Sequence, residues 1–346
     1  MTPAWPSINR IYSRLKIICS KKAKYCLIFT FHRIILVHNS DDLQWKQSIQ
    51  RIPSESAFYV YDHLSLIYSL IYEEGKFCIM QLGIIAPPEE ISFIQAQKRK
   101  LRFLEFCVNE GDDVNAFCDR VRELEAWKDQ YGIQVGSIGR WKSIRIDRNG
   151  NVLEEEVQRC FKLIDAAAEL QCPSFVAGCN YVDELSLFDN CAAAIAFFSK
   201  LIAYASPKNV KISTYNCRKI NFVHSPDIWR IIHGHLPQLG IKYDPSHAVF
   251  FGGDYLQETL EWGHRFYHVH LKGSLLINGV KVDEPPAGLD QTDWPSFLAT
   301  LRAAGYDAGL SIEPRKSALS DHLADRGVDF SASYFRKLLL ESLEEE

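Results

Sequence analysis

From Met80 onward the sequence predicts a (β/α)8 barrel, and two observations support this prediction. First, short apolar segments typical of buried strands alternate with helical stretches, which implies a parallel sheet covered by helices. Second, eight such units fit into residues 80–346, and a closed barrel of this kind takes about 250 residues. The candidate strands span residues 80–86, 102–108, 133–138, 174–179, 210–216, 240–244, 265–272 and 308–313.

The stretches between these strands show the periodicity of helices with one apolar face. A helix is predicted over 113–131, where apolar side chains recur three or four residues apart, and another over 153–170, which Gln171-Cys-Pro ends. The alternative is an open, doubly wound sheet. That fold usually carries a glycine-rich phosphate loop after its first strand. Here the corresponding turn reads Pro87-Pro-Glu-Glu, which favours the barrel.

Composition and charge exclude several classes of protein. The chain has 346 residues with a net charge of −4, so no basic field favours nucleic acid or an anionic membrane as a partner. Its ten cysteines are irregularly spaced without a C-x-x-C pair, which argues against zinc ribbons and disulfide scaffolds. Residues 25–37 form an apolar run that is too short and too interrupted to span a bilayer. We therefore expect a cytoplasmic protein with reduced thiols.

Residues 1–79 differ from the remainder. They hold ten Lys/Arg against six Asp/Glu, whereas residues 80–346 hold 29 against 37. No sustained period runs through them, and the run 66–72 suits a strand or a helix equally. We expect an extension that is disordered or not native. Codons for Glu74-Gly-Lys form a purine-rich run that resembles a bacterial ribosome-binding site, and the only methionines are Met1 and Met80. We hypothesise that translation starts at Met80; peptides from residues 14–45 in the native protein would contradict this.

Polar residues that suit metal binding stand at the ends of three consecutive predicted strands. In such barrels the active site lies at the carboxyl ends of the strands. Alternation places His270 on the inner face of the seventh strand, between His268 and Lys272. Asp244 ends the sixth strand and Glu313 the eighth. Two carboxylates and one imidazole form a hard, mixed oxygen and nitrogen set that suits Mn²⁺, Mg²⁺, Co²⁺ or Fe²⁺, with Zn²⁺ also acceptable.

Four sequence blocks in this order resemble the xylose isomerase-like TIM barrels of the sugar phosphate isomerase/epimerase family. They are residues 240–247, 266–273, 288–294 and 305–313, and the resemblance covers residues 80–346 only. It implies one divalent metal ion, preferably manganese, with Asp244, His270 and Glu313 as ligands. By the same resemblance, His247 looks like the substrate-contacting histidine of the family. Lys272 matches a lysine that often follows the metal-binding histidine.

The chain departs from the family at the end of the fifth strand. Many members carry a glutamate there, whereas this chain has Tyr215-Asn216. Asn216 would either supply an amide oxygen to the metal or serve as a turn residue. In either case the two-glutamate proton shuttle of the ketose 3-epimerases is not intact, which weakens simple 3-epimerisation. Endonuclease IV, another member, is a poor match because it uses many more His and Glu ligands around several zinc ions.

The expected chemistry begins with removal of the proton beside a carbonyl group, with the metal as Lewis acid. Glu313 is the first candidate for the base, followed by His247, Glu105 and Lys272. Glu105 could instead be a buried salt-bridge partner. Polar or aromatic residues at other strand ends are candidate sugar contacts: Arg140, Trp141, Asn180, Tyr181, His268 and Arg315.

These expectations leave the reaction open. A sugar isomerase or epimerase acting on a small carbohydrate, weakly favoured as unphosphorylated, is the first hypothesis. A lyase or dehydratase acting on a 3-keto sugar or glycoside is the second, and a non-catalytic sugar-binding or partner subunit is the third. The long loop 274–288 would form a lid or a contact between copies in a homo-oligomer.

Overall fold

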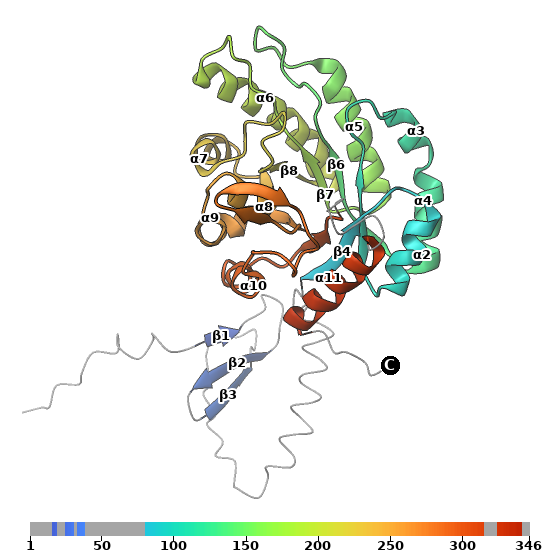
Figure 1. The fold of residues 1–346 in the computed structure, drawn as a ribbon, viewed down its shortest axis with the longest axis vertical. Coiled ribbons are helices and arrows are strands. Elements are labelled where there is room, and N and C mark those ends of the chain that lie inside the picture. Colours follow the sequence, from blue (N-terminus) through green and yellow to red (C-terminus); the bar gives the residue numbers. More distant parts are fainter. Residues whose placement is uncertain (1–15, 19–24, 31–32, 39–79, 315–323, 341–346) are drawn as a thin grey trace, which may run out of the picture. The chain divides into compact units, whose positions relative to one another are not determined.

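The computed structural model describes residues 16–18, 25–30, 33–38, 80–314 and 324–340. The chain divides into two compact units, Met1–Phe77 and Cys78–Glu346. In the first unit β1 (Lys16–Ile18), β2 (Tyr25–Thr30) and β3 (Arg33–His38) form an antiparallel sheet in that order (Figure 1). This departs from the expected lack of regular structure, because two apolar runs only two residues apart pair as a hairpin. The run 66–72 lies outside the described residues.

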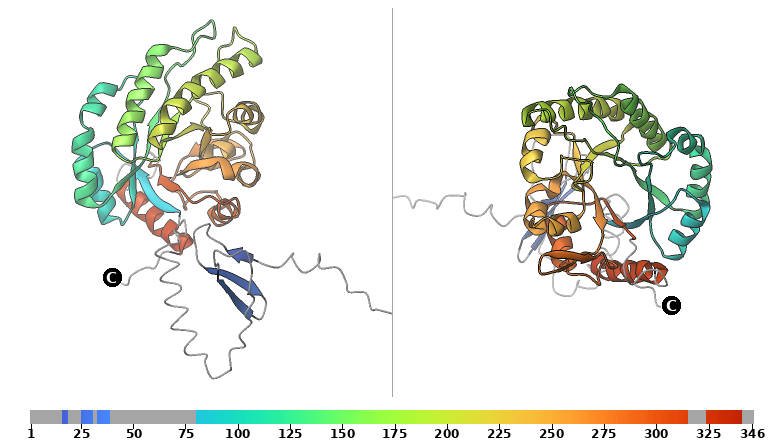
Figure 2. Two further views of the ribbon diagram at one scale, coloured as in Figure 1. Left: turned by 180° about the vertical axis from the view of Figure 1, so that it is seen from behind. Right: turned by 45° about the horizontal axis from the view of Figure 1, so that its top comes forward.

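The second unit is a closed barrel of eight parallel strands (Figure 2). This confirms the predicted (β/α)8 fold and excludes the open sheet, because the last strand pairs with the first: Leu310 lies beside Leu82. The strands follow the predicted order with bounds trimmed by one or two residues at most places. They are β4 (Gln81–Ile85), β5 (Phe103–Cys107), β6 (Gln134–Arg140), β7 (Ser174–Ala177), β8 (Lys211–Tyr215), β9 (Gly240–Tyr243), β10 (Phe266–Leu271) and β13 (Gly309–Ile312).

Helices surround the barrel, as the right-hand view of Figure 2 shows. The single helix predicted over 113–131 is in fact two, because the backbone at Arg120 leaves the helical region (φ −96°, ψ 2°). Both parts still bury the predicted apolar face. The described helices are α2 (Glu90–Lys98), α3 (Val114–Asp119), α4 (Val121–Tyr131), α5 (Glu154–Glu169), α6 (Leu187–Ala205), α7 (Pro226–His235), α8 (Pro245–Phe250), α9 (Tyr255–Trp262), α10 (Trp294–Ala303) and α11 (Ala324–Leu339), with 3-10 turns η4 (Ser206–Lys208) and η5 (Gly263–Arg265).

One helical segment among the described residues, Leu187–Lys208, is long and apolar enough by length and composition to cross a membrane. It comprises α6 and η4 and covers the outside of the barrel beside β8. Phe197, Phe198 and Leu201 of this segment are fully buried in the hydrophobic core. The same apolar composition is what a helix packed against a barrel requires.

The loop 274–288 contains a two-stranded antiparallel hairpin, β11 (Leu275–Ile277) and β12 (Val280–Asp283), that precedes α10. Its turn residues Asn278 and Gly279 both have positive φ, 50° and 76°. Asn-Gly is the preferred pair for such a turn, because these residues adopt the left-handed conformation at low cost. Ile277, Val280 and Val282 of the hairpin are exposed.

The aromatic ring of Phe103 fills the interior of the barrel beside three glycines of neighbouring strands. Phe103 points inward from β5, and a Cβ atom at Gly83, Gly136 or Gly309 would lie under 3.0 Å from its ring. Glycine at these three positions therefore leaves the volume that the ring fills. His268 packs edge-on against the same ring at 5.8 Å between centroids, so this ring supports the lowest histidine of the site.

Two expected sugar contacts prove to be part of the framework. Arg140, at the end of β6, is buried in a bidentate pair with Glu156 of α5, with Nε–Oε2 at 3.0 Å and Nη2–Oε1 at 2.9 Å. Arg145 donates to the same carboxylate at 2.8 Å. The Asn180 amide oxygen accepts from the backbone N–H groups of Arg145 and Ile146. Both polar groups are satisfied by the protein, and their expected contact with sugar stays a prediction.

The buried Glu156 carboxylate predicts a pH-dependent loss of stability when it is removed. Although burial raises its pKa, hydrogen bonds from Arg140 and Arg159 outweigh this and hold the pKa below its ordinary value. The stabilisation is therefore present above the unfolded-state value and is lost as the pH falls through the lower folded-state value. We expect Glu156→Ala to lower the free energy of unfolding by about 3–5 kcal/mol at neutral pH.

Denaturation with urea at neutral pH and at acid pH measures this effect. The difference between wild type and Glu156→Ala should shrink as the pH falls. Glu155→Ala, one residue earlier on the exposed face of α5, is the control and should leave the free energy of unfolding nearly unchanged. An equal loss in both variants would contradict a special role for the buried pair.

Candidate active site

Asp244 stands where β9 ends and α8 begins, and its position is fixed from two sides. Its Oδ1 accepts from Ser246 N at 2.9 Å and from Ser246 Oγ at 2.7 Å, as an N-cap side chain does. Asn216, after β8, donates from Nδ2 to the Asp244 carbonyl at 2.8 Å and accepts from Asp244 N at 3.0 Å. Both ends of the Asn216 amide thus hold the backbone of Asp244, and the expected role of Asn216 as a metal ligand stays a prediction.

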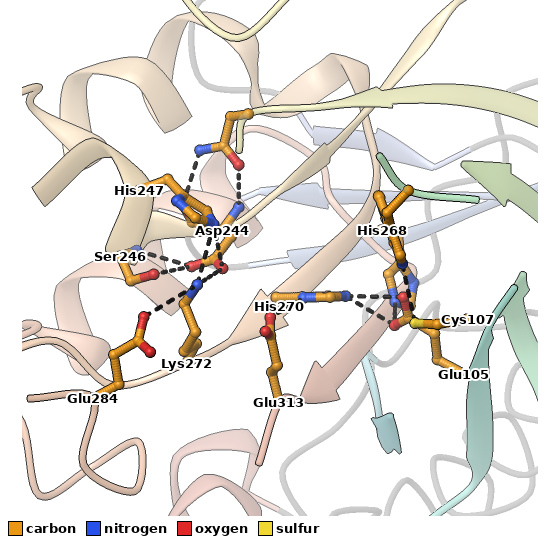
Figure 3. Close-up of polar contacts among 12 residues, drawn as sticks. Glu105, Cys107, Asp244, Ser246, His247, His268, His270, Lys272, Glu284 and Glu313 are labelled. Carbon is orange, nitrogen blue, oxygen red and sulfur yellow. Dashed lines mark hydrogen bonds and ion pairs between the residues drawn. The ribbon is translucent and has the colours of Figure 1, made fainter. Parts of the chain in front are cut away.

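His270 lies between two carboxylates that come from different strands (Figure 3). Its Nε2 lies 2.9 Å and 3.0 Å from the two oxygens of Glu105, and its Nδ1 lies 2.7 Å from Glu313 Oε2. Burial lowers the pKa of His270, but the charge of Glu105 and both hydrogen bonds outweigh it, and the pKa is raised. An ionised carboxylate only accepts, so both ring nitrogens of His270 donate in this arrangement.

Glu105 is a buried positioning residue. Its side chain is 0% exposed, and besides His270 it accepts from His268 Nε2 at 2.7 Å. Burial alone would raise its pKa, but the charges of His270 and His268 lower it, so Glu105 stays ionised. With both oxygens occupied by imidazoles and no exposed surface, it matches the salt-bridge alternative rather than the expected base. His268 lies against Phe103 beneath His270, which corrects its expected contact with sugar.

Lys272 lies at the centre of a second group of polar side chains, around Asp244 (Figure 3). Its Nζ lies 3.0 Å from Asp244 Oδ2, 3.1 Å from His247 Nε2 and 3.8 Å from Glu284 Oε1. Burial lowers the pKa of His247 to about 3, so its imidazole is neutral and its Nε2 accepts from the ammonium group. Because the basic nitrogen of His247 is occupied in this way, His247 and Lys272 act as one hydrogen-bonded unit.

The residues present fit a divalent cation. Ligand atoms of Asp244, His270 and Glu313 lie within 4.8 Å of one another. Asp244 Oδ2 is buried without a hydrogen bond, although the ammonium group of Lys272 is close. Glu105, His268 and His270 form a second group within the same distance, but the oxygens of Glu105 are taken by the two imidazoles. The first group therefore suits a hard cation, with Glu105 orienting its histidine.

The two aromatic residues expected to contact sugar, Trp141 and Tyr181, lie in different surroundings. The half-buried Trp141 donates from Nε1 to Cys107 Sγ at 3.1 Å. Its ring packs edge-on against Tyr215 at 4.6 Å between centroids, and these two contacts fix its position at the carboxyl ends of β6 and β8. Tyr181 is 43% exposed and packs against Phe222 instead. Arg315 lies outside the described residues.

Sequence reasoning missed some residues of the site. Lys242 faces inward two residues before Asp244 and is buried, and alternation along β9 would have revealed it. Ser246 and Glu284 bind groups of the site, but nothing in their local sequence distinguishes them from turn residues.

Comparison with known proteins gives concordant results. Residues 93–336 match the sequence family described as Xylose isomerase-like TIM barrel. The structure is similar to a xylose isomerase domain protein from Planctomyces limnophilus, with a TM-score of 0.62, 18% identity and coverage of 75% of this chain and 97% of that one. The D-allulose 3-epimerase from Methylomonas sp. aligns with a TM-score of 0.59 and 14% identity over 75% and 98% of the two chains.

Two further relatives are similar over different extents. The 3-keto-D-glucoside 4-epimerase from E. coli aligns with a TM-score of 0.59 and 15% identity over 75% of this chain and 99% of that one. An uncharacterised protein of Bacillus subtilis, YfiH, is 26% identical over 149 residues, which are 37% of this chain and 47% of YfiH, so the match spans about half of that relative. The structural likenesses establish the fold, and the family match covers most of the chain. The protein therefore belongs to the xylose isomerase-like TIM barrel family.

Proposed function

We propose that this protein is a divalent-metal-dependent sugar isomerase or epimerase that acts at the carbon beside a carbonyl group. The observation that carries the proposal is the set of Asp244, His270 and Glu313, whose ligand atoms lie within 4.8 Å of one another at the barrel mouth. The epimerases of similar fold, for D-allulose and for a 3-keto-D-glucoside, support a carbohydrate substrate. Manganese is the preferred ion, and Mg²⁺, Co²⁺, Fe²⁺ and Zn²⁺ suit the same donors.

A bound divalent ion supplies Lewis acidity, which makes the hydrogen beside the sugar carbonyl easier to remove. Glu313 is the group that accepts this proton. Burial raises its pKa, but the charges of Lys272 and His270 outweigh this and hold the pKa well below its ordinary value, so the carboxylate is ionised at neutral pH. Return of the proton to the opposite face of the same carbon gives epimerisation, and return to the neighbouring carbon gives isomerisation.

One observation favours a second candidate. Asn216 stands where a carboxylate of the fifth strand would complete a pair of bases, and its amide is bound to the backbone of Asp244. A reaction that needs one base suits this site better than one that needs two. Elimination of a leaving group from a 3-keto sugar or glycoside is such a reaction, and it begins with the same proton removal.

Solvent exchange tests the proposed reaction. With Mn²⁺ in D₂O, we expect the full-length protein to place deuterium beside the carbonyl of D-fructose, D-tagatose or D-allulose, detected by NMR. Glu313→Gln should lower the rate at least about 100-fold, because the proton acceptor is lost. Elemental mass spectrometry should find about one metal ion per chain in the wild type, which Asp244→Asn loses.

Glu261→Gln is the matched control, because Glu261 is an exposed residue of α9 away from the site. It should retain both the metal and the exchange rate. Loss of the leaving group from a 3-keto-glycoside, without deuterium in any ketose, would assign the protein to the lyases. A metal-loaded wild type that neither exchanges nor eliminates would refute the proposed function.

The raised pKa of His270 predicts that metal binding depends on pH. A metal ion must displace the proton on Nδ1, so affinity should fall as the pH drops, beginning above the ordinary histidine value of 6.5. In Glu105→Gln the charge that raises this pKa is absent, so the onset should move to lower pH. Above the onset, affinity should be about 10–100-fold weaker, because the imidazole has lost the carboxylate that orients it.

Titration calorimetry in buffers of different ionisation enthalpy measures both the affinity and the protons released per ion. Glu261→Gln again serves as the control and should follow the wild-type curve. An affinity that stays constant between about pH 6 and pH 8 would show that His270 carries no proton to displace.

A further inference from the structure

We infer that the substrate carries a carboxylate and that Lys242, beside Trp141, binds it. This inference rests on the proposed function, because it names the class of sugar for the same site. The substrate would be a sugar acid rather than a neutral sugar.

The fold places Lys242 inside the barrel. It belongs to β9 and precedes Asp244 by two residues, so the two side chains share the inner face of the strand. The residue between them, Tyr243, points outward and stacks on Phe266 at 4.4 Å between ring centroids. Lys242 is only 4% exposed, and the strand on which it stands is hydrogen-bonded on both sides.

The ammonium group of Lys242 lies where a ligand would meet it. Its charge lowers the pKa values of Asp244 and Glu313, which places it within electrostatic reach of both proposed metal-binding carboxylates. Its Nζ lies 5.4 Å from the centroid of the Trp141 ring, a cation–π contact. Trp141 is held by Cys107 and Tyr215, so it offers Lys242 a fixed aromatic wall.

Within residues 80–314 and 324–340, no carboxylate pairs with Lys242 within 4.0 Å and no hydrogen bond to its Nζ occurs. The other buried lysines differ. Lys272 lies 3.0 Å from Asp244 Oδ2, and Lys128 of α4 donates to Gln171 at 3.0 Å. The Nζ of Lys242 is not among the fully buried side-chain atoms without a partner, so it stays accessible to a ligand. An anionic group of the ligand, next to the sites for its carbonyl and hydroxyl oxygens, would supply the missing partner.

The balance of charge at the mouth supports one negative charge on the ligand. Four carboxylates face three ammonium groups and the imidazolium of His270, so these charges balance. A divalent cation that displaces one proton from His270 adds one net positive charge. A carboxylate of the substrate would neutralise the loaded site. The groups counted are Glu105, Asp244, Glu284 and Glu313 against Lys242, Lys272, Lys281 and His270.

Binding of matched sugars tests this inference without relying on catalysis. D-fructuronate and D-tagaturonate differ from D-fructose and D-tagatose only by oxidation of the terminal hydroxymethyl group. With the metal-loaded, full-length protein, calorimetry should show roughly tenfold to hundredfold tighter binding of each acid than of its neutral sugar, as expected for a hydrogen bond to a charged group. Lys242→Met should remove this preference, so that each acid and its neutral sugar bind equally.

Two variants make the comparison specific. Lys242→Arg keeps the charge and should keep a preference for the acids. Lys128→Met removes a buried lysine far from the mouth and should behave as the wild type. Metal content, measured on every variant, should stay unchanged. If Lys242→Met does not fold, the ratio of acid to neutral affinity in the wild type and in Lys242→Arg still decides the inference.

The outcomes separate this inference from the proposed function. Equal binding of acids and neutral sugars by the wild type, or a preference that survives in Lys242→Met, would overturn the inference even if ketoses exchange their proton. A preference for the acids that depends on Lys242, without any exchange, would support the inference and refute the proposed reaction. Tighter binding of D-fructose 6-phosphate than of D-fructuronate would overturn the carboxylate assignment in favour of a phosphate. Failure to bind any of these sugars would overturn the inference.

Discussion

The geometry of the site depends on one interaction: His270 is hydrogen-bonded through both ring nitrogens to the carboxylates of Glu105 and Glu313. Glu105 belongs to β5 and Glu313 directly follows β13, and β4 separates these two strands in the barrel wall. The imidazole therefore connects two parts of the wall across the interior. Glu105 also holds His268, and His268 rests on Phe103, whose ring fills the space left by three glycines. The direction of the His270 ring is thus set by contacts that extend from the mouth to the ring of Phe103.

A second cluster, centred on an ammonium group, lies beside the first. Around Lys272, the carboxylates of Asp244 and Glu284 and the neutral imidazole of His247 share one ammonium group. The two clusters meet at Asp244 and Glu313, the carboxylates proposed to hold the metal. The positive charges of Lys272 and Lys242 keep both ionised despite their burial, and His270 adds to this effect at Glu313. The protein thus maintains the proposed metal-binding arrangement at the cost of several buried charges, which a functional site explains better than stability does.

The polar residues expected at the site fall into two groups: some converge at the barrel mouth, and others are hydrogen-bonded by neighbouring protein groups. Asp244, His270 and Glu313 stand at strand ends and converge as their positions indicated. Arg140 and Asn180 also stand at strand ends, yet Glu156 satisfies the first and the backbone of Arg145 and Ile146 the second. A polar residue type at a strand end shows that a partner is needed, but it does not show whether the protein or a ligand provides it. For the same reason Lys242, which lacks a direct partner among the described residues, is more informative than Arg140.

The sequence by itself determined the number and order of the barrel strands, because apolar segments alternate with helices regardless of their final contacts. It also determined which residues face inward, because alternation along a strand is a property of the extended backbone. Only the tertiary structure decided that Glu105 holds two histidines, that Asn216 holds Asp244, and that the apolar residues near 25–37 pair as a hairpin. Those pairings join residues up to 165 positions apart, and closure of the barrel sets the distance between them. No local pattern in the chain encodes that distance.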